Sequence, residues 1–127
     1  DAVSSASVYA KHEVPPKFEG LSAREKRGEA LFQANCAFCH GADGTGKNWI
    51  GQFMEPKARD LTAYSDATMP AARLKQVIRE GLPGTSMPAW QHVLKPQEID
   101  AVAAYLRRAM WRGQSAQQAR SLQQPHP

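Results

Sequence analysis

The sequence predicts a helical domain, because apolar residues recur at helical spacing in three segments. These segments cover residues 22–35, 70–81 and 96–110. Stretches rich in glycine and proline separate them, as expected of loops between helices. With 127 residues, the chain is long enough for one domain with tails and too short for two independent cores.

The first helix is expected to begin at Ser22. Ser22 and Glu25 have the spacing of a capping box, in which each side chain accepts a hydrogen bond from the backbone N–H of the other residue. Gly28, Leu31 and Phe32 follow on one face of the helix. A glycine inside a helix costs about 1 kcal/mol relative to alanine. Gly28 therefore predicts the close approach of another helix.

The other two helices have boundaries that the sequence marks. The second begins near Pro70 and ends at Gly81, because proline favours a first turn and glycine favours the residue after a last turn. The third begins with Pro96 and ends near Gly113. Its apolar face carries Ile99, Val102, Ala103, Leu106 and Met110.

The remaining segments are expected to be irregular. Residues 49–62 lack periodicity, so we expect one long loop there, with a short helix between residues 61 and 66. Residues 1–20 are small, polar and interrupted by proline, which predicts an extended N-terminal arm. Residues 113–127 form a Gln-rich tail, so the folded domain is expected to span residues 21–112. Val8, Tyr9 and Phe18 are expected to anchor the arm.

The only two cysteines lie in the stretch Cys36-Ala-Phe-Cys39-His40. This C-x-x-C-H spacing is the signature of covalent haem attachment. At the end of a helical turn, the two thiols can each add to a vinyl group on one edge of a porphyrin, while the next imidazole reaches the iron. We therefore predict one haem c bound through Cys36 and Cys39, with a ring nitrogen of His40 as the proximal iron ligand.

Three other interpretations of the cysteines are weaker. A structural zinc site needs two further ligands, but the remaining histidines, His12, His92 and His126, are distant in sequence. Of these, His12 lies in the arm, where we expect it to be solvated. A thioredoxin-type redox pair would follow a strand, whereas here a helical pattern precedes the motif. An ordinary structural disulfide is the third alternative.

Composition also favours a bound cofactor. Leu, Ile, Val and Phe make up 21 of the 127 residues, which is below the roughly 20% at which a chain struggles to bury enough apolar surface. A covalently bound haem would supply the missing apolar body. We therefore expect the chain without haem to be poorly folded.

The formal net charge of +4 comes from residues 101–127, which contain four arginines and no acidic residue. No basic stripe is interleaved with aromatic residues, so nothing indicates nucleic-acid binding. No apolar run reaches the length of a membrane span. The chain begins at Asp1 without an apolar signal region, which we interpret as a mature chain after signal-peptide removal.

A low-spin haem iron also needs a second axial ligand, for which the chain offers four methionines. Met87 lies in the loop of residues 81–90, whose prolines can hold a thioether in place; a thioether is a weak ligand for ferric iron and needs such support. We predict Met87 as this ligand, with Met69, His92 or an open position as alternatives. Packing roles are expected for Met54, Met69 and Met110.

Together these stretches resemble the bacterial class I monohaem c-type cytochromes. The resemblance covers about residues 22–110. It is carried by Gly28 and Phe32, by Asn35 to Gly46, by Gly84-Thr-Ser-Met-Pro-Ala-Trp90 and by Val102-Ala-Ala-Tyr-Leu106. It implies the all-α class I cytochrome c fold, in which the first and last helices cross and Gly28 and Phe32 meet Val102 and Tyr105. It also implies periplasmic haem attachment and one-electron transfer.

The resemblance further suggests residues that would surround the haem. Family members place a proline after the haem loop whose carbonyl accepts a hydrogen bond from the proximal imidazole, and Pro56 is the candidate here. Trp49, Arg59 and Trp90 can donate hydrogen bonds to haem propionates, and the arginine would make the stronger, charge-assisted contact. Their alternative roles are partial burial and a surface salt bridge.

We therefore expect a periplasmic one-electron carrier, rather than an enzyme, that docks its exposed haem edge against donor and acceptor proteins. The alternative is a haem c subunit permanently docked in a larger oxidoreductase, with the two tails at the interface. A gas or peroxide sensor would need an open sixth position and a distal group, for which His92 is the candidate. The expected partners are redox proteins, and the protein is expected to be a monomer or a subunit of such a complex.

Overall fold

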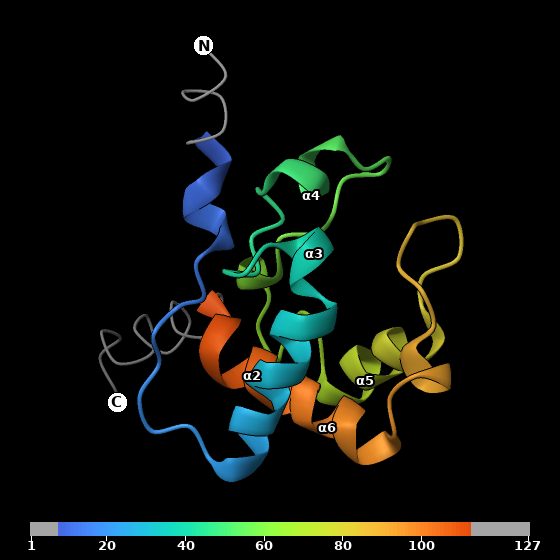
Figure 1. The fold of residues 1–127 in the computed structure, drawn as a ribbon. Coiled ribbons are helices and arrows are strands. Elements are labelled where there is room, and N and C mark those ends of the chain that lie inside the picture. The colour runs from blue at the N-terminus through green and yellow to red at the C-terminus, as the bar shows by residue number, and fades with distance from the viewer. Residues whose placement is uncertain (1–7, 113–127) are drawn as a thin grey trace, which may run out of the picture.

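The computed structural model describes residues 8–112, and in that range the chain is helical and contains no strand (Figure 1). The α-helices are α2 (Ala23–Asn35), α3 (Ala37–His40), α4 (Trp49–Phe53), α5 (Ala71–Glu80) and α6 (Pro96–Tyr105). Shorter turns are η1 (Lys11–Glu13), η2 (Leu61–Ala63), η3 (Trp90–His92) and η4 (Leu106–Met110). Within the described range, no helix is long and apolar enough to cross a membrane.

The three helices predicted from periodicity are confirmed as α2, α5 and α6. The capping box at the start of α2 is formed, because the backbone N–H of Glu25 donates to Ser22 Oγ at 3.1 Å and that of Ser22 donates to Glu25 Oε1 at 2.8 Å. Gly81 ends α5 with a φ of 75°, and Pro96 occupies the first turn of α6. The predicted Gln-rich tail lies outside the described residues.

Helices α2 and α6 cross, and their contact is the centre of the buried core (Figure 1). A Cβ atom at Gly28 would overlap the carbonyl oxygen of Ala101 and lie 2.8 Å from Tyr105 Cβ. The rings of Phe32 and Tyr105 lie 5.8 Å apart, and both side chains are fully buried. The predicted crossing is therefore confirmed, and the missing side chain of Gly28 explains it.

Segment 49–62 differs from the predicted loop, because it begins with helix α4. Asn48 precedes α4 and is buried, and its Nδ2 donates to the carbonyl of Phe38 at 3.0 Å. Gln52 Nε2, within α4, donates to the carbonyl of Gly46 at 2.8 Å. These side chains tie α4 to the preceding loop, a tertiary stabilisation that periodicity does not reveal. The short helix expected between residues 61 and 66 is confirmed as η2.

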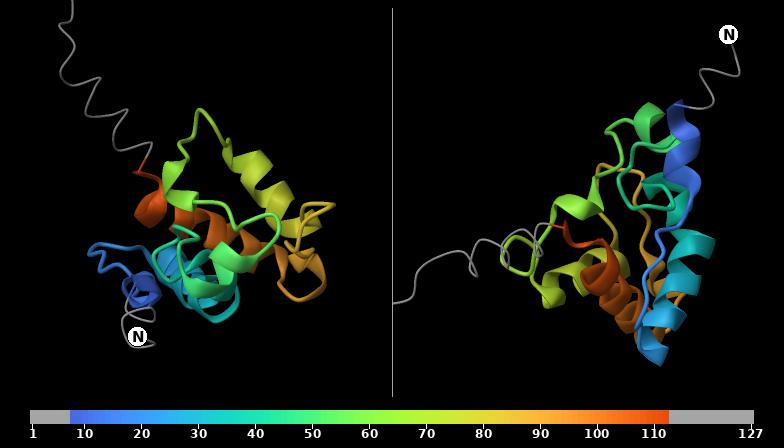
Figure 2. Two further views of the ribbon diagram at one scale, coloured as in Figure 1. Left: turned by 90° about the horizontal axis from the view of Figure 1, so that it is seen from above. Right: turned by 90° about the vertical axis from the view of Figure 1, so that its left-hand side faces the viewer.

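The N-terminal arm is less extended than predicted. Residues 8–10 are helical and lead into η1, after which the chain runs back beside α2 to the start of that helix (Figure 2). Tyr9 contacts the ring of Trp49 at 5.1 Å, and Phe18 lies 5.0 Å beneath the guanidinium of Arg108. Both therefore anchor the arm as predicted. Val8, the third predicted anchor, is 61% exposed.

His12 is also not solvated, contrary to the prediction. Its carbonyl accepts a hydrogen bond from the backbone N–H of Ala42 at 2.8 Å. Its Nδ1 lies 2.7 Å from Asp43 Oδ2, and both side chains are mostly buried. The arm thus clasps the loop that follows His40, through a contact between residues far apart in sequence.

The crossing makes the first testable prediction. Replacing Gly28 with alanine should destabilise the haem-loaded protein by about 2 kcal/mol or more, since overpacking of a tight core commonly costs 1–3 kcal/mol and the overlapped atom is a backbone oxygen that no rotamer can move. This loss exceeds the gain of about 1 kcal/mol in helix propensity. The free energy of unfolding in urea measures the difference.

The matched control is Lys26→Ala, an exposed substitution in the same helix. It should change the free energy of unfolding by no more than about 0.5 kcal/mol. A Gly28→Ala protein as stable as this control would show that α2 and α6 are not in backbone contact.

Candidate haem-binding site

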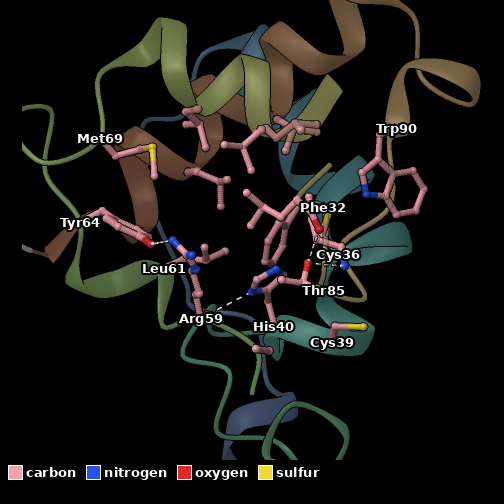
Figure 3. Close-up of a pocket in the computed structure, with 18 of the residues that line it drawn as sticks. Phe32, Cys36, Cys39, His40, Arg59, Leu61, Tyr64, Met69, Thr85 and Trp90 are labelled. Atoms are coloured by element: carbon pink, nitrogen blue, oxygen red, sulfur yellow. Dashed lines mark hydrogen bonds between the residues drawn. The ribbon is translucent and has the colours of Figure 1, made fainter. Parts of the chain in front are cut away.

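A cavity of about 370 Å³ opens between the α2–α6 crossing and the loops that precede and follow α5. Its wall is mostly apolar and is drawn from α2, α3, α5, α6 and both loops (Figure 3). The predicted site residues in this wall are Cys36, Cys39, His40, Pro56, Arg59, Met87 and Trp90.

The C-x-x-C-H residues lie where α2 passes into α3. The N–H of Cys36 donates to the carbonyl of Phe32 at 2.8 Å, and the N–H of His40 donates to the carbonyl of Cys36 at 3.0 Å. Because the chain keeps helical hydrogen bonds through the junction, the two cysteines and His40 all face the cavity. The two thiols are not joined in a disulfide.

Burial sets the ionisation of these groups. Desolvation, with a smaller contribution from Cys39, raises the pKa of the Cys36 thiol to about 12, and desolvation also raises the pKa of Cys39. Burial lowers the pKa of His40, and its hydrogen bond to the Arg59 carbonyl only partly offsets that effect. The imidazole is therefore held neutral, which is the form that binds a metal.

The orientation of His40 is fixed by a backbone carbonyl, but that carbonyl is not the one predicted. His40 Nδ1 lies 3.1 Å from the carbonyl oxygen of Arg59, so the Nδ1–H tautomer leaves Nε2 free to bind iron. Pro56, the predicted acceptor, lies in the cavity wall instead. Gly46 explains the difference, because a Cβ there would lie 2.6 Å from the Ala58 carbonyl and 3.1 Å from that of Arg59. Its absence lets residues 58–59 approach the haem loop.

The contact between His12 and Asp43 also stabilises the loop that follows His40. Asp43 Oδ1 accepts hydrogen bonds from the N–H and the hydroxyl of Thr45 at 3.1 and 2.8 Å, while Oδ2 meets His12. Partial burial alone would raise the pKa of the Asp43 carboxyl, but the hydrogen bonds from His12 and Thr45 outweigh it and hold this pKa below its usual value. The turn after His40 is thus fixed on both sides.

Met87 is presented to the cavity by a closed loop. The N–H of Leu82 donates to the carbonyl of Met87 at 3.2 Å, and the N–H of Met87 donates to Thr85 Oγ1 at 3.1 Å. Gly81 permits this closure, since a Cβ there would lie 2.7 Å from the Met87 carbonyl oxygen. Met54 and Met69 also line the cavity, whereas Met110 is buried in the core and His92 is not among the described lining residues.

The predicted propionate donors divide into two groups. Arg59 and Trp90 line the cavity, and Arg59 Nη1 donates to the hydroxyl of Tyr64 at 3.3 Å. Trp49 lies elsewhere: it is 51% exposed and stacks on Phe53 at 4.6 Å, so the structure does not place it at the haem. The sequence prediction also missed Tyr64 and Trp111, which line the cavity. An aromatic residue directly after the last helical segment was the signal available for Trp111.

Comparison with known proteins decides the family. Residues 23–106 match the family described as cytochrome C oxidase, cbb3-type, subunit III. The chain is a class I c-type cytochrome.

Two curated proteins and one solved structure are similar in sequence to this cytochrome. It is 36% identical over 87 residues to cytochrome c6 of Nostoc sp., covering 68% of this chain and 71% of that protein. It is also 36% identical over 87 residues to the cbb3-type cytochrome c oxidase subunit FixP of Azorhizobium caulinodans, covering 68% of this chain but 28% of that protein. The solved KustC0563 c-type cytochrome is 28% identical with a TM-score of 0.50, covering 63% of this chain and 93% of that one.

The cavity of this cytochrome fits a covalently bound haem c. Cys36 and Cys39 are the attachment residues, and the neutral imidazole of His40 lies between them and Arg59 (Figure 3). The apolar wall suits a porphyrin, and the wall residue Trp111 has a buried indole N–H that finds no hydrogen-bond partner among the described residues. When bound, the haem supplies a one-electron change between ferrous and ferric iron. The protein holds the group, excludes water and orients the ligands.

Proposed function

We propose that this cytochrome carries single electrons between redox proteins in the periplasm, with His40 and Met87 as the two axial ligands of its haem iron. The closed Met87 loop is the observation that supports this proposal most strongly. A thioether binds ferric iron weakly, so a methionine ligand must be held in place by the chain. The hydrogen bonds that the backbone of Met87 makes with Leu82 and Thr85 hold it within the loop.

The protein's own contribution is electrostatic and steric. The Arg59 carbonyl increases the basicity of the His40 imidazole through the Nδ1 hydrogen bond, which stabilises ferric iron, whereas a methionine ligand raises the potential. The apolar wall keeps the dielectric around the iron low. In this proposal no side chain makes or breaks a bond in a substrate, so the protein is a carrier and not an enzyme.

The ligand assignment is tested by replacing Met87 with leucine, a substitution of similar volume. We expect the oxidised variant to lose the weak absorption band at the red end of the visible spectrum that a methionine sulphur bound to ferric iron produces. The reduction potential should also fall, because methionine ligation raises it. Optical spectra and a redox titration measure both effects.

Met54→Leu and Met69→Leu are matched controls, since both methionines line the same cavity. Each variant should keep the absorption band and have the same reduction potential as the native protein. Loss of the band in Met69→Leu and its survival in Met87→Leu would move the ligand to Met69. A native protein without the band would favour an open or non-methionine sixth position.

A permanently docked subunit is the second candidate, and an exposed aromatic surface favours it. Trp49, Phe53 and Phe38 are 51%, 68% and 70% exposed, and Cys39 and Met54, their chain neighbours, line the cavity. Large exposed apolar patches commonly mark interaction sites. The FixP relative is named as an oxidase subunit, and this chain spans a minor part of it.

Gel filtration of the cytochrome from an extract of its own cells separates the two candidates. A free carrier should elute at the size of one chain with its haem, with no other protein in the haem-containing fraction, at both low and high salt. A haem-containing fraction that stays in a stoichiometric complex through both conditions would establish the docked subunit instead.

A further inference from the structure

Trp111 carries a buried polar group that no atom of residues 8–112 satisfies. The residue is 3% exposed, and its indole Nε1 has no hydrogen-bond partner in that range. A buried donor without an acceptor destabilises the folded state, because it has lost its hydrogen bonds to water. Trp111 belongs to the wall of the haem cavity, so a polar group of the bound haem could accept this hydrogen bond.

A change of helical register brings Trp111 to this wall. Helix α6 continues into η4, a π-helical turn, and the N–H of Trp111 donates to the carbonyl of Leu106 at 3.0 Å, five residues back. Val102, Leu106 and Trp111 consequently line the cavity at spacings of four and then five residues. In a regular α-helix the next position on that face would be residue 109 or 110, but Met110 is buried against Gly44. Single π-turns are often found at functional sites.

Two further hydrogen-bonding residues lie beside Trp111. The ring of Tyr64 contacts its indole at a centroid distance of 5.4 Å. Arg59 in turn donates to the Tyr64 hydroxyl at 3.3 Å. This corner therefore gathers an indole N–H, a phenol and a guanidinium, a set of donors suited to an anionic oxygen.

The corner lies across the cavity from the cysteines. Cys36 and Cys39 are on one side of the cavity, and Arg59 and Tyr64 are on the opposite side (Figure 3). In haem, the two propionate carboxylates leave the porphyrin on the edge opposite the vinyl groups that become thioethers. A haem joined to Cys36 and Cys39 must then direct its carboxylates toward the donors of this corner.

We propose that Trp111 is a haem-positioning residue, which donates its indole N–H to a propionate carboxylate in a site completed by Tyr64 and Arg59. The indole nitrogen is buried, so the proposal requires a neighbouring side chain to move when the carboxylate binds. Tyr64 is the candidate, because its ring contacts the indole, it is only partly buried, and its hydrogen bond is to the exposed Arg59. In this proposal the π-turn of η4 has a function, because its change of register places Trp111 in the cavity wall.

The first test uses the native, haem-loaded protein in its ferrous state. Its three tryptophans give three indole N–H proton signals, and Trp111→Phe identifies one of them by its loss. We expect the Trp111 signal to show nuclear Overhauser contacts to the propionate methylene protons and to exchange slowly with solvent. An assigned Trp111 signal with contacts to protein protons alone would overturn the proposal.

The second test compares reduction potentials. Trp111→Phe keeps an aromatic ring but removes the donor, which leaves the carboxylate charge less stabilised and so favours ferric iron. Its potential should shift below that of the native protein, whereas Trp49→Phe, at an exposed site away from the cavity, should not shift. Equal potentials for the two variants would overturn the proposal. If Trp111→Phe fails to fold, the signals lost in Trp49→Phe and Trp90→Phe identify that of Trp111 by elimination, and its contacts in the native protein then decide the proposal.

The inference rests on the covalent haem and not on the identity of the sixth ligand. The optical spectrum of the same oxidised sample reports separately whether methionine binds the iron. A failure of the Met87 assignment is therefore seen independently of the indole contacts.

Discussion

The haem anchored at the junction of α2 and α3 is the constraint on which the rest of this structure depends. The crossing of α2 and α6 packs helix directly on helix, but the loops that carry Arg59 and Met87 meet that core around the cavity. Without haem, water would reach the apolar wall of this cavity, and burial of apolar surface is the dominant favourable contribution to folding. Small domains are stable by only about 5–15 kcal/mol in total. We therefore expect folding of the chain to depend on a filled cavity.

Attachment of the haem at Cys36 and Cys39 determines which protein groups are needed on each side of the cavity. Thioethers at Cys36 and Cys39 would fix one edge of the porphyrin, and His40 is oriented by the Arg59 carbonyl at 3.1 Å. The remaining positions are left to segments distant in sequence: the Met87 loop, the Arg59 loop and the end of η4. The N-terminal arm adds its clasp on Asp43. One short motif is therefore supported by contacts from most of the described chain.

Features with a local physical cause could be predicted from the sequence. The capping box at Ser22, the proline and glycine boundaries of the later helices, and the C-x-x-C-H spacing each act within a few residues. Gly28 predicted a long-range contact correctly, because a glycine inside a helix needs a reason and a second helix is the common one. The cavity wall contains Met87 as expected, although Met54 and Met69 share it.

Features that depend on tertiary approach could not be predicted in the same way. Pro56 was a reasonable acceptor for His40 in sequence, but Gly46 admits the backbone of residues 58–59 and brings Arg59 there instead. Trp49 carries the same donor as Trp111, yet α4 turns it toward Tyr9 and Phe53, while a single π-turn brings Trp111 to the cavity. His12 finds Asp43 across 31 residues. None of these placements has a periodic signature.

Hydrogen exchange of the backbone amides, with and without haem, tests the central dependence on haem most directly. The haem-loaded cytochrome should protect amides of α2, α5 and α6 against exchange as one cooperative unit. The same chain produced without haem, and its Cys36→Ala/Cys39→Ala variant, should lose that protection throughout, α5 included. A haem-free chain that keeps the slow-exchanging amides of all three helices and unfolds cooperatively would show that the protein core alone is sufficient, and would contradict this account.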